Sequence, residues 1–227
     1  MNNRFPKLFL LTLFALLIPA AGSAQQTAED YLRLGKEQLE KKEYLRAKES
    51  FEKAVELDPD SAEAYCFRGM VQLDDKQAAA DFTKAIELKP DYAEAYFRRG
   101  LGSDLGGNNQ AALEDYNKAI ELNPKFVNAY MTRAVLYLLA NKGKEAIADY
   151  TKVIELKPDG ESYYVRGNAH LEIGEYAAAV DDLTRSIKLD PTYYWSYMQR
   201  AKAYRHINQP RLAEADERQA ARIGPPK

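Results

Sequence analysis

An arginine and an aspartate recur along this sequence in a pattern that favours ion pairs. Arg99 follows Tyr96 by one helical turn, on a flank where a leucine would be easier to bury, and Asp115 lies further along the chain. The planar guanidinium fork matches a carboxylate and can bond to it through two parallel hydrogen bonds. The recurring residues are Arg68, Arg99, Arg133, Arg166 and Arg200, with Asp81, Asp115, Asp149, Asp182 and Asp216.

The two charges are present or absent together. Residues 28–61 have Leu34 where the arginine would stand and Ser50 where the aspartate would stand. If each aspartate paired with the next arginine along the chain, Arg68 and Asp216 would lack partners. We therefore predict that each arginine bonds to the aspartate that follows it, and that the pair sets the register of two helices rather than adding net stability. The alternative is that both charges face water.

Other groups that could do chemistry are few. The sequence has no Gly-rich loop before Lys-Ser or Lys-Thr, no G-x-S-x-G and no H-E-x-x-H motif. His170 stands where related segments have Tyr137 and Tyr204, so a packing role is expected. Cys66 is the single cysteine, which excludes an intramolecular disulfide and favours a small apolar filler over a reactive thiol. We predict no catalytic residue, cofactor or metal site, and a protein that is not an enzyme.

Composition sets further bounds. The chain has 227 residues, of which 46% are hydrophobic, and its net charge is −2. That is enough apolar sequence for one sizeable domain. Because no run of five like charges occurs, nothing predicts nucleic acid as a partner.

The N-terminus has the pattern of a secretory signal peptide. Basic residues Arg4 and Lys7 precede a short apolar run that Pro19 ends, and small residues follow to Ala24. The sequence therefore predicts a signal peptide over 1–24, a mature chain over 25–227 exported to the periplasm or secreted, and no membrane insertion after cleavage. An uncleaved membrane anchor is the alternative.

Internal repeats determine the expected architecture. Prolines recur at intervals of 31 to 34 residues from Pro59 to Pro225. They divide the chain into six units, over 28–61, 62–92, 93–126, 127–159, 160–193 and 194–227. Each unit contains two helical patterns in which small and large apolar residues alternate. A proline ends each unit, because it cannot continue a helix interior. The unit over 62–92 is three residues short between its helices, which predicts either a local change of curvature or only a trimmed turn.

The period, the small–large alternation and the terminal proline resemble the tetratricopeptide repeat (TPR), and the resemblance covers essentially the whole mature chain. It implies an all-α fold: a right-handed α-solenoid of six antiparallel helix pairs, whose first helices line a concave face. A single pair cannot bury its apolar face alone, so neighbouring pairs must stack.

The resemblance also implies which side chains face the concave groove. They are apolar in the central units, which suits an extended peptide or an amphipathic partner helix. The alternative is that they pack against neighbouring first helices. The predicted groove residues are Phe67, Met70, Phe97, Leu101, Met131, Val135, Leu138, Tyr164 and Met198.

Glutamates recur in the expected first helical turns, as Glu29, Glu63, Glu94 and Glu161. The helix dipole favours anions there, so a structural role is expected. An acidic rim that selects a basic partner is the alternative.

Together these features predict a non-enzymatic scaffold outside the cytoplasm that binds a protein or peptide in its apolar concave groove. The oligomeric state is left open. One alternative is an accessory subunit or assembly factor of an envelope complex, acting through its convex face or its ends. An enzyme or a regulatory subunit is the remaining alternative.

Overall fold

The computed structural model describes residues 26–225, and this region folds into twelve α-helices without a strand. Each of the six sequence units holds one helix pair. The helices are α1 (Ala28–Glu40), α2 (Tyr44–Leu57), α3 (Ala62–Met70), α4 (Asp75–Leu88), α5 (Ala93–Leu105), α6 (Asn109–Leu122), α7 (Val127–Leu139), α8 (Gly143–Leu156), α9 (Gly160–Glu172), α10 (Tyr176–Leu189), α11 (Tyr194–His206) and α12 (Pro210–Ile223).

Short polar side chains begin several of these helices. Thr27, Ser61 and Asp159 each accept a hydrogen bond from a backbone N–H three residues later, as do the side chains that precede α4 and α6. These bonds satisfy donors that have no partner inside the helix. The glutamates predicted in first turns lie there in α1, α3, α5 and α9, where the helix dipole favours negative charge.

Within a pair, a small residue on the first helix faces a large residue on the second. A Cβ atom added at Gly100 would lie 2.8 Å from the Tyr116 ring, and one added at Gly35 would lie 2.5 Å from the Phe51 ring. Such distances are too short for carbon atoms in contact, so the two helices approach as closely as they do only because the side chain is absent. Tyr116 and Phe51 are fully buried as a result.

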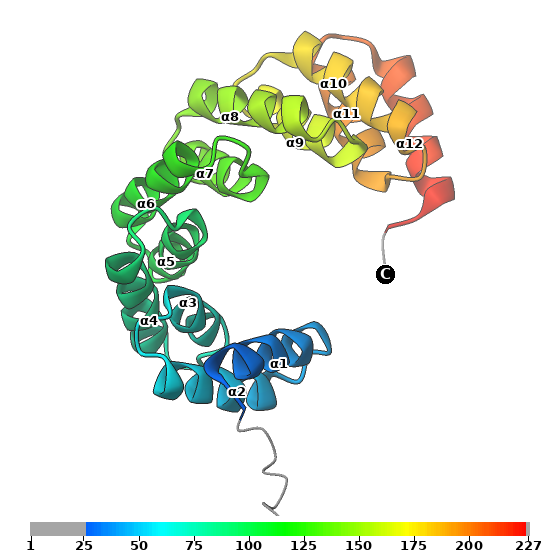
Figure 1. Ribbon diagram of the computed structural model, residues 1–227. Helices are drawn as coiled ribbons and strands as arrows, with labels where there is room; N and C mark the ends of the chain where they lie inside the picture. The colour runs from blue at the N-terminus through cyan, green and yellow to red at the C-terminus, as the bar shows by residue number, and fades with distance from the viewer. Residues whose placement is uncertain (1–25, 226–227) are drawn as a thin grey trace, which may run out of the picture.

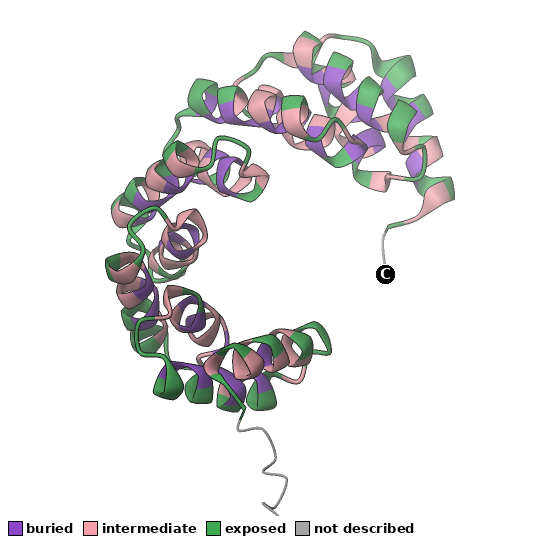
Figure 2. Cartoon of the chain, in the orientation of Figure 1, coloured by how far each residue is buried: buried purple, intermediate pink, exposed green. Residues whose placement is uncertain are grey.

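The pairs stack in sequence order into an open arc (Figure 1). Each second helix contacts the first helix of the following pair. In Figure 1, α3, α5 and α7 lie on the inner side of the arc and α4 and α6 on the outer side. Buried residues follow the seams between helices, whereas both faces of the arc carry exposed and half-buried residues (Figure 2). The chain is therefore an α-solenoid with a concave face formed by first helices.

The shortened unit loses the last turn of its first helix. Helix α3 has 9 residues, whereas α5 has 13. Leu73 lies in the turn after α3 and is 86% exposed. Gln72 donates a hydrogen bond to Asp81, at 3.4 Å, and so connects this turn to α4. The shortening therefore removes the last helical turn of α3, and α3 still pairs with α4.

The predicted signal peptide over 1–24 lies outside the described residues. Among residues 26–225, no helix has both the length and the apolar character that crossing a membrane requires.

Candidate functional site

Each recurring arginine is paired with the aspartate of its own unit. Arg99 donates from Nε to one carboxylate oxygen of Asp115 at 2.9 Å and from Nη2 to the other at 2.8 Å. Arg133 and Asp149 have the same arrangement at 2.8 and 2.6 Å. The other three pairs, also bonded through both carboxylate oxygens, are Arg68–Asp81, Arg166–Asp182 and Arg200–Asp216.

These pairs lie in the interior of the helix hairpins rather than at the surface. The Arg133 side chain is 16% exposed and that of Asp149 is 7% exposed. The guanidinium of Arg99 lies 5.6 Å from the Tyr96 ring centre, so the tyrosine one turn earlier adds a cation–π contact. The hydrogen bonds to Asp115 raise the pKa of Arg99. The arginine can occupy this partly buried position because its guanidinium is bonded to a carboxylate and lies against an aromatic ring.

The arginines also bond across unit boundaries, which the sequence analysis did not predict. Nη1 of Arg133 donates to Oδ1 of Asn117 in the preceding unit at 2.6 Å. A threonine takes the same place in three other junctions, in the bonds Arg99–Thr83, Arg166–Thr151 and Arg200–Thr184. The signal was in the sequence, because each of these acceptors follows the recurring aspartate of its own unit by two residues.

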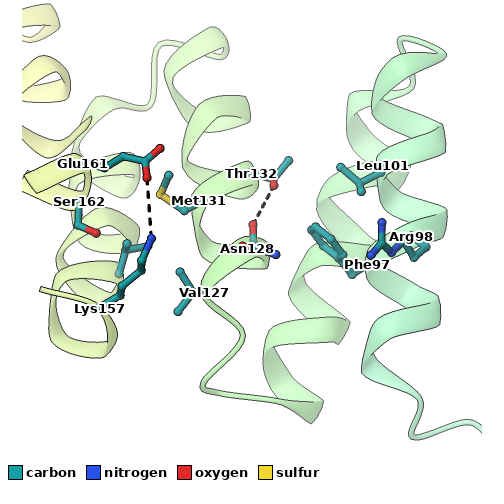
Figure 3. A pocket seen from close by; sticks show the side chains of 11 residues that line it. Phe97, Arg98, Leu101, Val127, Asn128, Met131, Thr132, Lys157, Glu161 and Ser162 are labelled. Carbon is teal, nitrogen blue, oxygen red and sulfur yellow. Dashed lines mark hydrogen bonds and ion pairs between the residues drawn. The ribbon is translucent and has the colours of Figure 1, made fainter. Parts of the chain in front are cut away.

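A pocket of about 380 Å³ opens between the units formed by α5–α6, α7–α8 and α9–α10 (Figure 3). In Figure 3, Asn128 and Thr132 of α7 lie toward Phe97 and Leu101 of α5, whereas Met131 lies on the side of α7 toward Lys157 and Glu161. The remaining lining residues are Arg98, Val127, Asn128, Thr132, Val153, Lys157, Glu161 and Ser162. Three of the predicted groove residues thus meet at one place.

The charged groups around this pocket are mostly paired with one another. Arg98 donates to Glu94 at 2.6 Å. Lys157 lies 2.8 Å from Asp159 and 3.8 Å from Glu161. The lining is therefore a mixture of apolar side chains and polar groups, and no carboxylate or histidine is buried inside it as a general acid or base would be.

The predicted groove residues differ in how far they are open to solvent. Val135 is 48% exposed. Most of the others are half-buried, and these are Phe67, Met70, Leu101, Met131, Leu138, Tyr164 and Met198. The sequence analysis left open whether these side chains are exposed in a groove or pack against neighbouring helices. The half-buried residues do both.

Phe97 requires a correction. It is only 5% exposed, because its ring packs 4.8 Å from that of Phe126 and 5.8 Å from that of Tyr116. Phe97 therefore belongs to the core and lines the pocket from there, rather than projecting into an open groove.

Two exposed leucines, one on α5 and one on α7, were not predicted to lie in the groove. Leu105 is 90% exposed at the end of α5, and Leu139 is 70% exposed at the end of α7. Each follows a predicted groove residue by four positions, Leu101 and Val135 respectively. Extending the helical period by one turn would have found them.

His170 and Cys66 occupy structural positions. His170 is 13% exposed, with Nδ1 2.7 Å from Glu175 and Nε2 3.7 Å from Asp182. Cys66 is buried, and burial raises the pKa of its thiol to about 11. Among the described residues, no group of three or more potential ligands is placed to hold a metal ion.

Comparison with known families finds the tetratricopeptide repeat over residues 28–61, 127–159 and 160–193, and a TPR repeat over 105–140. These ranges together cover more than half of the chain. No curated protein matches the sequence significantly.

Solved structures share the fold at low identity. The pilF structure of Pseudomonas aeruginosa is 18% identical with a TM-score of 0.73, over 88% of this chain and 93% of that one. A tetratricopeptide repeat protein of Parabacteroides merdae is 20% identical with a TM-score of 0.70, over 89% and 82%. YrrB, described as a TPR protein with an unusual peptide-binding site, is 20% identical with a TM-score of 0.69, over 78% and 94%. This chain spans only 41% of the matched chain of the APC/C hetero-tetramer Cut9–Hcn1, to which it is 21% identical with a TM-score of 0.67.

Proposed function

Because this chain belongs to the tetratricopeptide repeat family, we propose that it is a non-enzymatic scaffold that binds a partner protein in its concave groove, outside the cytoplasm. The pocket between α5, α7 and α9 carries this proposal. Apolar side chains of neighbouring units line it together with the cations Arg98 and Lys157, which are paired with carboxylates.

The chemistry of the pocket suits a protein side chain. Leu101 and Met131 provide an apolar, adaptable lining, and methionine in particular adjusts to differently shaped partners. The exposed apolar residues Val135, Leu105 and Leu139 lie further along the helices α5 and α7, which line the pocket. A partner that fills the pocket with one large apolar residue would therefore cover further apolar area beside it.

The shared fold agrees with such a role. The YrrB structure is described as having a peptide-binding site, and Cut9–Hcn1 is a hetero-tetramer. The export part of the proposal is supported by the sequence pattern over residues 1–24.

Site-specific photo-crosslinking in cells tests where the partner binds. A photoreactive residue replaces Met131 in the groove or, in control variants, Leu45 or Leu212, which are 71% and 46% exposed on second helices. We expect a covalent partner adduct from position 131 and none from the two controls. Adducts from the controls alone would contradict the proposal and favour binding through the convex face or an end.

A second variant checks that the groove is needed for binding. We expect Leu101→Glu/Met131→Glu to lose the complex while retaining the helical circular dichroism of the unmodified chain. Phe97 is unsuitable for this test because it is a core residue.

Cell fractionation tests the location. We expect the chain in the periplasmic or secreted fraction, shortened by residues 1–24, and the same chain without those residues in the cytoplasm. A full-length chain that remains with the membrane would identify the segment as an anchor instead.

A further inference from the structure

The last helix, α12, carries arginines at positions where the other second helices mostly carry hydrogen-bond acceptors or carboxylates. We propose that the α12 end of the solenoid is a second docking surface, separate from the concave groove, for an acidic segment of a partner protein. This inference goes beyond the proposed function, because it adds a surface for a second partner.

The first changed position belongs to the bonds between units. At four inner junctions the second helix supplies an acceptor to an arginine of the following unit, as Asn117 does to Arg133. The acceptors are Thr83, Asn117, Thr151 and Thr184. Each follows the recurring aspartate by two residues, and the residue two positions after Asp216 is Arg218. A further arginine at this junction would meet a second guanidinium, so α12 offers a donor where the inner helices offer an acceptor.

The second changed position is acidic in the first four units. It holds Glu56, Glu87, Glu121 and Glu155, each paired with a lysine three residues earlier at 2.6 to 3.5 Å. In the last two units the position is basic, as Lys188 and Arg222. Arg222 forms no ion pair within residues 26–225. The balanced charge pairs of the inner second helices therefore do not continue to α12.

Three arginines form a stripe along α12, which is the last helix of the arc (Figure 1). Arg211, Arg218 and Arg222 are seven and four residues apart, so they lie on one face of the helix, and all three are exposed. Glu214 lies 3.8 Å from Arg218, and the other two carboxylates of α12 bond to arginines of α11. Leu212, the control position for crosslinking, lies about 100° around the helix from Arg211 and outside the stripe.

The charge of the last unit differs from that of the whole chain. Residues 194–227 contain seven lysines and arginines and three aspartates and glutamates, which gives a net charge of +4, whereas the chain has −2. Such a surface attracts acidic segments. An arginine also binds a carboxylate through two parallel hydrogen bonds, as the recurring pairs inside this chain do.

An aromatic pocket of about 230 Å³ adjoins the C-terminal end of the stripe. It is lined by Tyr193, Tyr194 and Trp195 around the start of α11, and by Ile223, Gly224 and Pro225 directly after Arg222. Trp195 is 42% exposed and contacts Tyr194 edge to face, with ring centres 5.0 Å apart. It stands where four other first helices have a first-turn glutamate. No charged side chain lines the pocket, which therefore suits an apolar residue.

The dimensions suit an extended acidic segment. Arg218 and Arg222 are about 6 Å apart along the helix axis at ~1.5 Å per residue. Alternate residues of an extended chain point to one side and are about 6.6 Å apart. Carboxylates at alternate positions can therefore bond to both arginines while an apolar residue beyond them enters the pocket. The pocket is recessed and its residues Tyr193, Tyr194 and Ile223 are half-buried, which favours a protein side chain over a lipid surface.

Intrinsic fluorescence makes the test specific to this surface, because Trp195 is the only tryptophan of the chain. The probe is a synthetic peptide of about ten residues with glutamate and serine at alternate positions and a leucine at each end. One reference peptide has glutamine in place of glutamate, and another has serine in place of leucine. Anisotropy of the labelled peptides with the purified full chain measures affinity, and Trp195 emission reports contact with the pocket.

We expect the acidic peptide to bind and to change the Trp195 emission. The glutamine peptide should bind about tenfold more weakly or less. The peptide without leucine should lose most of the emission change. The affinity of the acidic peptide should fall by about tenfold between about 50 and about 300 mM salt, because the charges are exposed and screened.

A charge variant and a matched control locate the binding. Arg218→Thr/Arg222→Glu gives α12 the residue types that α4 and α8 have at these positions, and it should weaken binding by about tenfold or more. Lys142→Thr/Lys144→Glu makes the same change of charge at exposed positions of the fourth unit. It should change the affinity by less than about twofold. All four side chains are exposed, so helical circular dichroism should be retained in both variants.

Several outcomes would overturn the inference. Unchanged binding by Arg218→Thr/Arg222→Glu would place the ligand elsewhere, and equal binding of the glutamine peptide would show that charge does not select it. Absence of binding by the acidic peptide would also refute it. Phosphatidylglycerol vesicles that change the Trp195 emission when the peptide does not would assign the surface to a membrane. The groove proposal is independent of these results, because crosslinking from position 131 tests it separately.

Discussion

Arg133 joins two neighbouring repeats, because its Nη1 donates to Oδ1 of Asn117 at 2.6 Å while its Nε and Nη2 bond to Asp149 of its own unit. One guanidinium therefore fixes the register within a helix hairpin and the position of that hairpin on the preceding one. In a solenoid, stability is approximately the sum of the stability of single repeats and of the contacts between neighbours. The arginine contributes to both.

The junction bond can be removed without breaking the ion pair. We expect Asn117→Ala to reduce the free energy of unfolding by about 0.5–1.5 kcal/mol, because the bond is exposed to solvent and water can replace it. Hydrogen exchange should increase mainly in α6 and α7, the helices on either side of the junction. An equal increase along the whole chain would show that the bond does not act locally.

The ion pair itself is expected to behave as a unit. Arg133→Leu and Asp149→Leu should each cost about 3–5 kcal/mol, because each leaves the opposite charge buried without its partner. The double variant should cost clearly less than the sum. Thermal or urea unfolding of the four proteins measures the coupling, and additive losses would show that the two charges act independently.

The close approach of α5 and α6 predicts opposite effects for two glycines on one helix. Gly100→Ala should destabilise the chain by about 1–3 kcal/mol, because the new Cβ would lie 2.8 Å from the Tyr116 ring. Gly102→Ala should stabilise it by about 0.5–1 kcal/mol, since nothing lies within 4 Å of its added Cβ and alanine favours the helix. Urea unfolding compares the two, and a loss of stability in both would contradict the steric explanation.

The burial of Cys66 predicts slow modification and a particular pH dependence. Burial raises the pKa of this thiol from 9.0 to about 11. The unfolded chain therefore loses the proton first, so stability falls as the pH rises from 9.0 towards 11. Below that range the ionisation of this thiol does not change the stability.

Two measurements check this prediction. Iodoacetamide at about pH 8 should modify the thiol only after unfolding. Urea unfolding at about pH 8 and pH 10 should show a loss of about 1 kcal/mol that is absent in Cys66→Ala. Rapid modification of the folded chain would contradict the burial of the thiol.

The sequence by itself determined the repeat, the helix pairs and the partners of the buried charges. Period, small–large alternation and proline placement are local features, and they repeat often enough to define the α-solenoid. The Arg–Asp pairing within each unit followed from the unit that lacks both, with Leu34 and Ser50 in their places. These inferences needed only the order of residues along the chain.

The tertiary structure alone decided which apolar side chains are covered. Phe97 and Leu105 lie on one helix, yet the first is 5% exposed and the second 90%. The difference arises because the Phe126 ring, which precedes the following unit's first helix, packs on Phe97. Exposure depends on how neighbouring units pack, and no period within one unit contains that information. The binding surface, unlike the fold, is therefore a property of the stacked array.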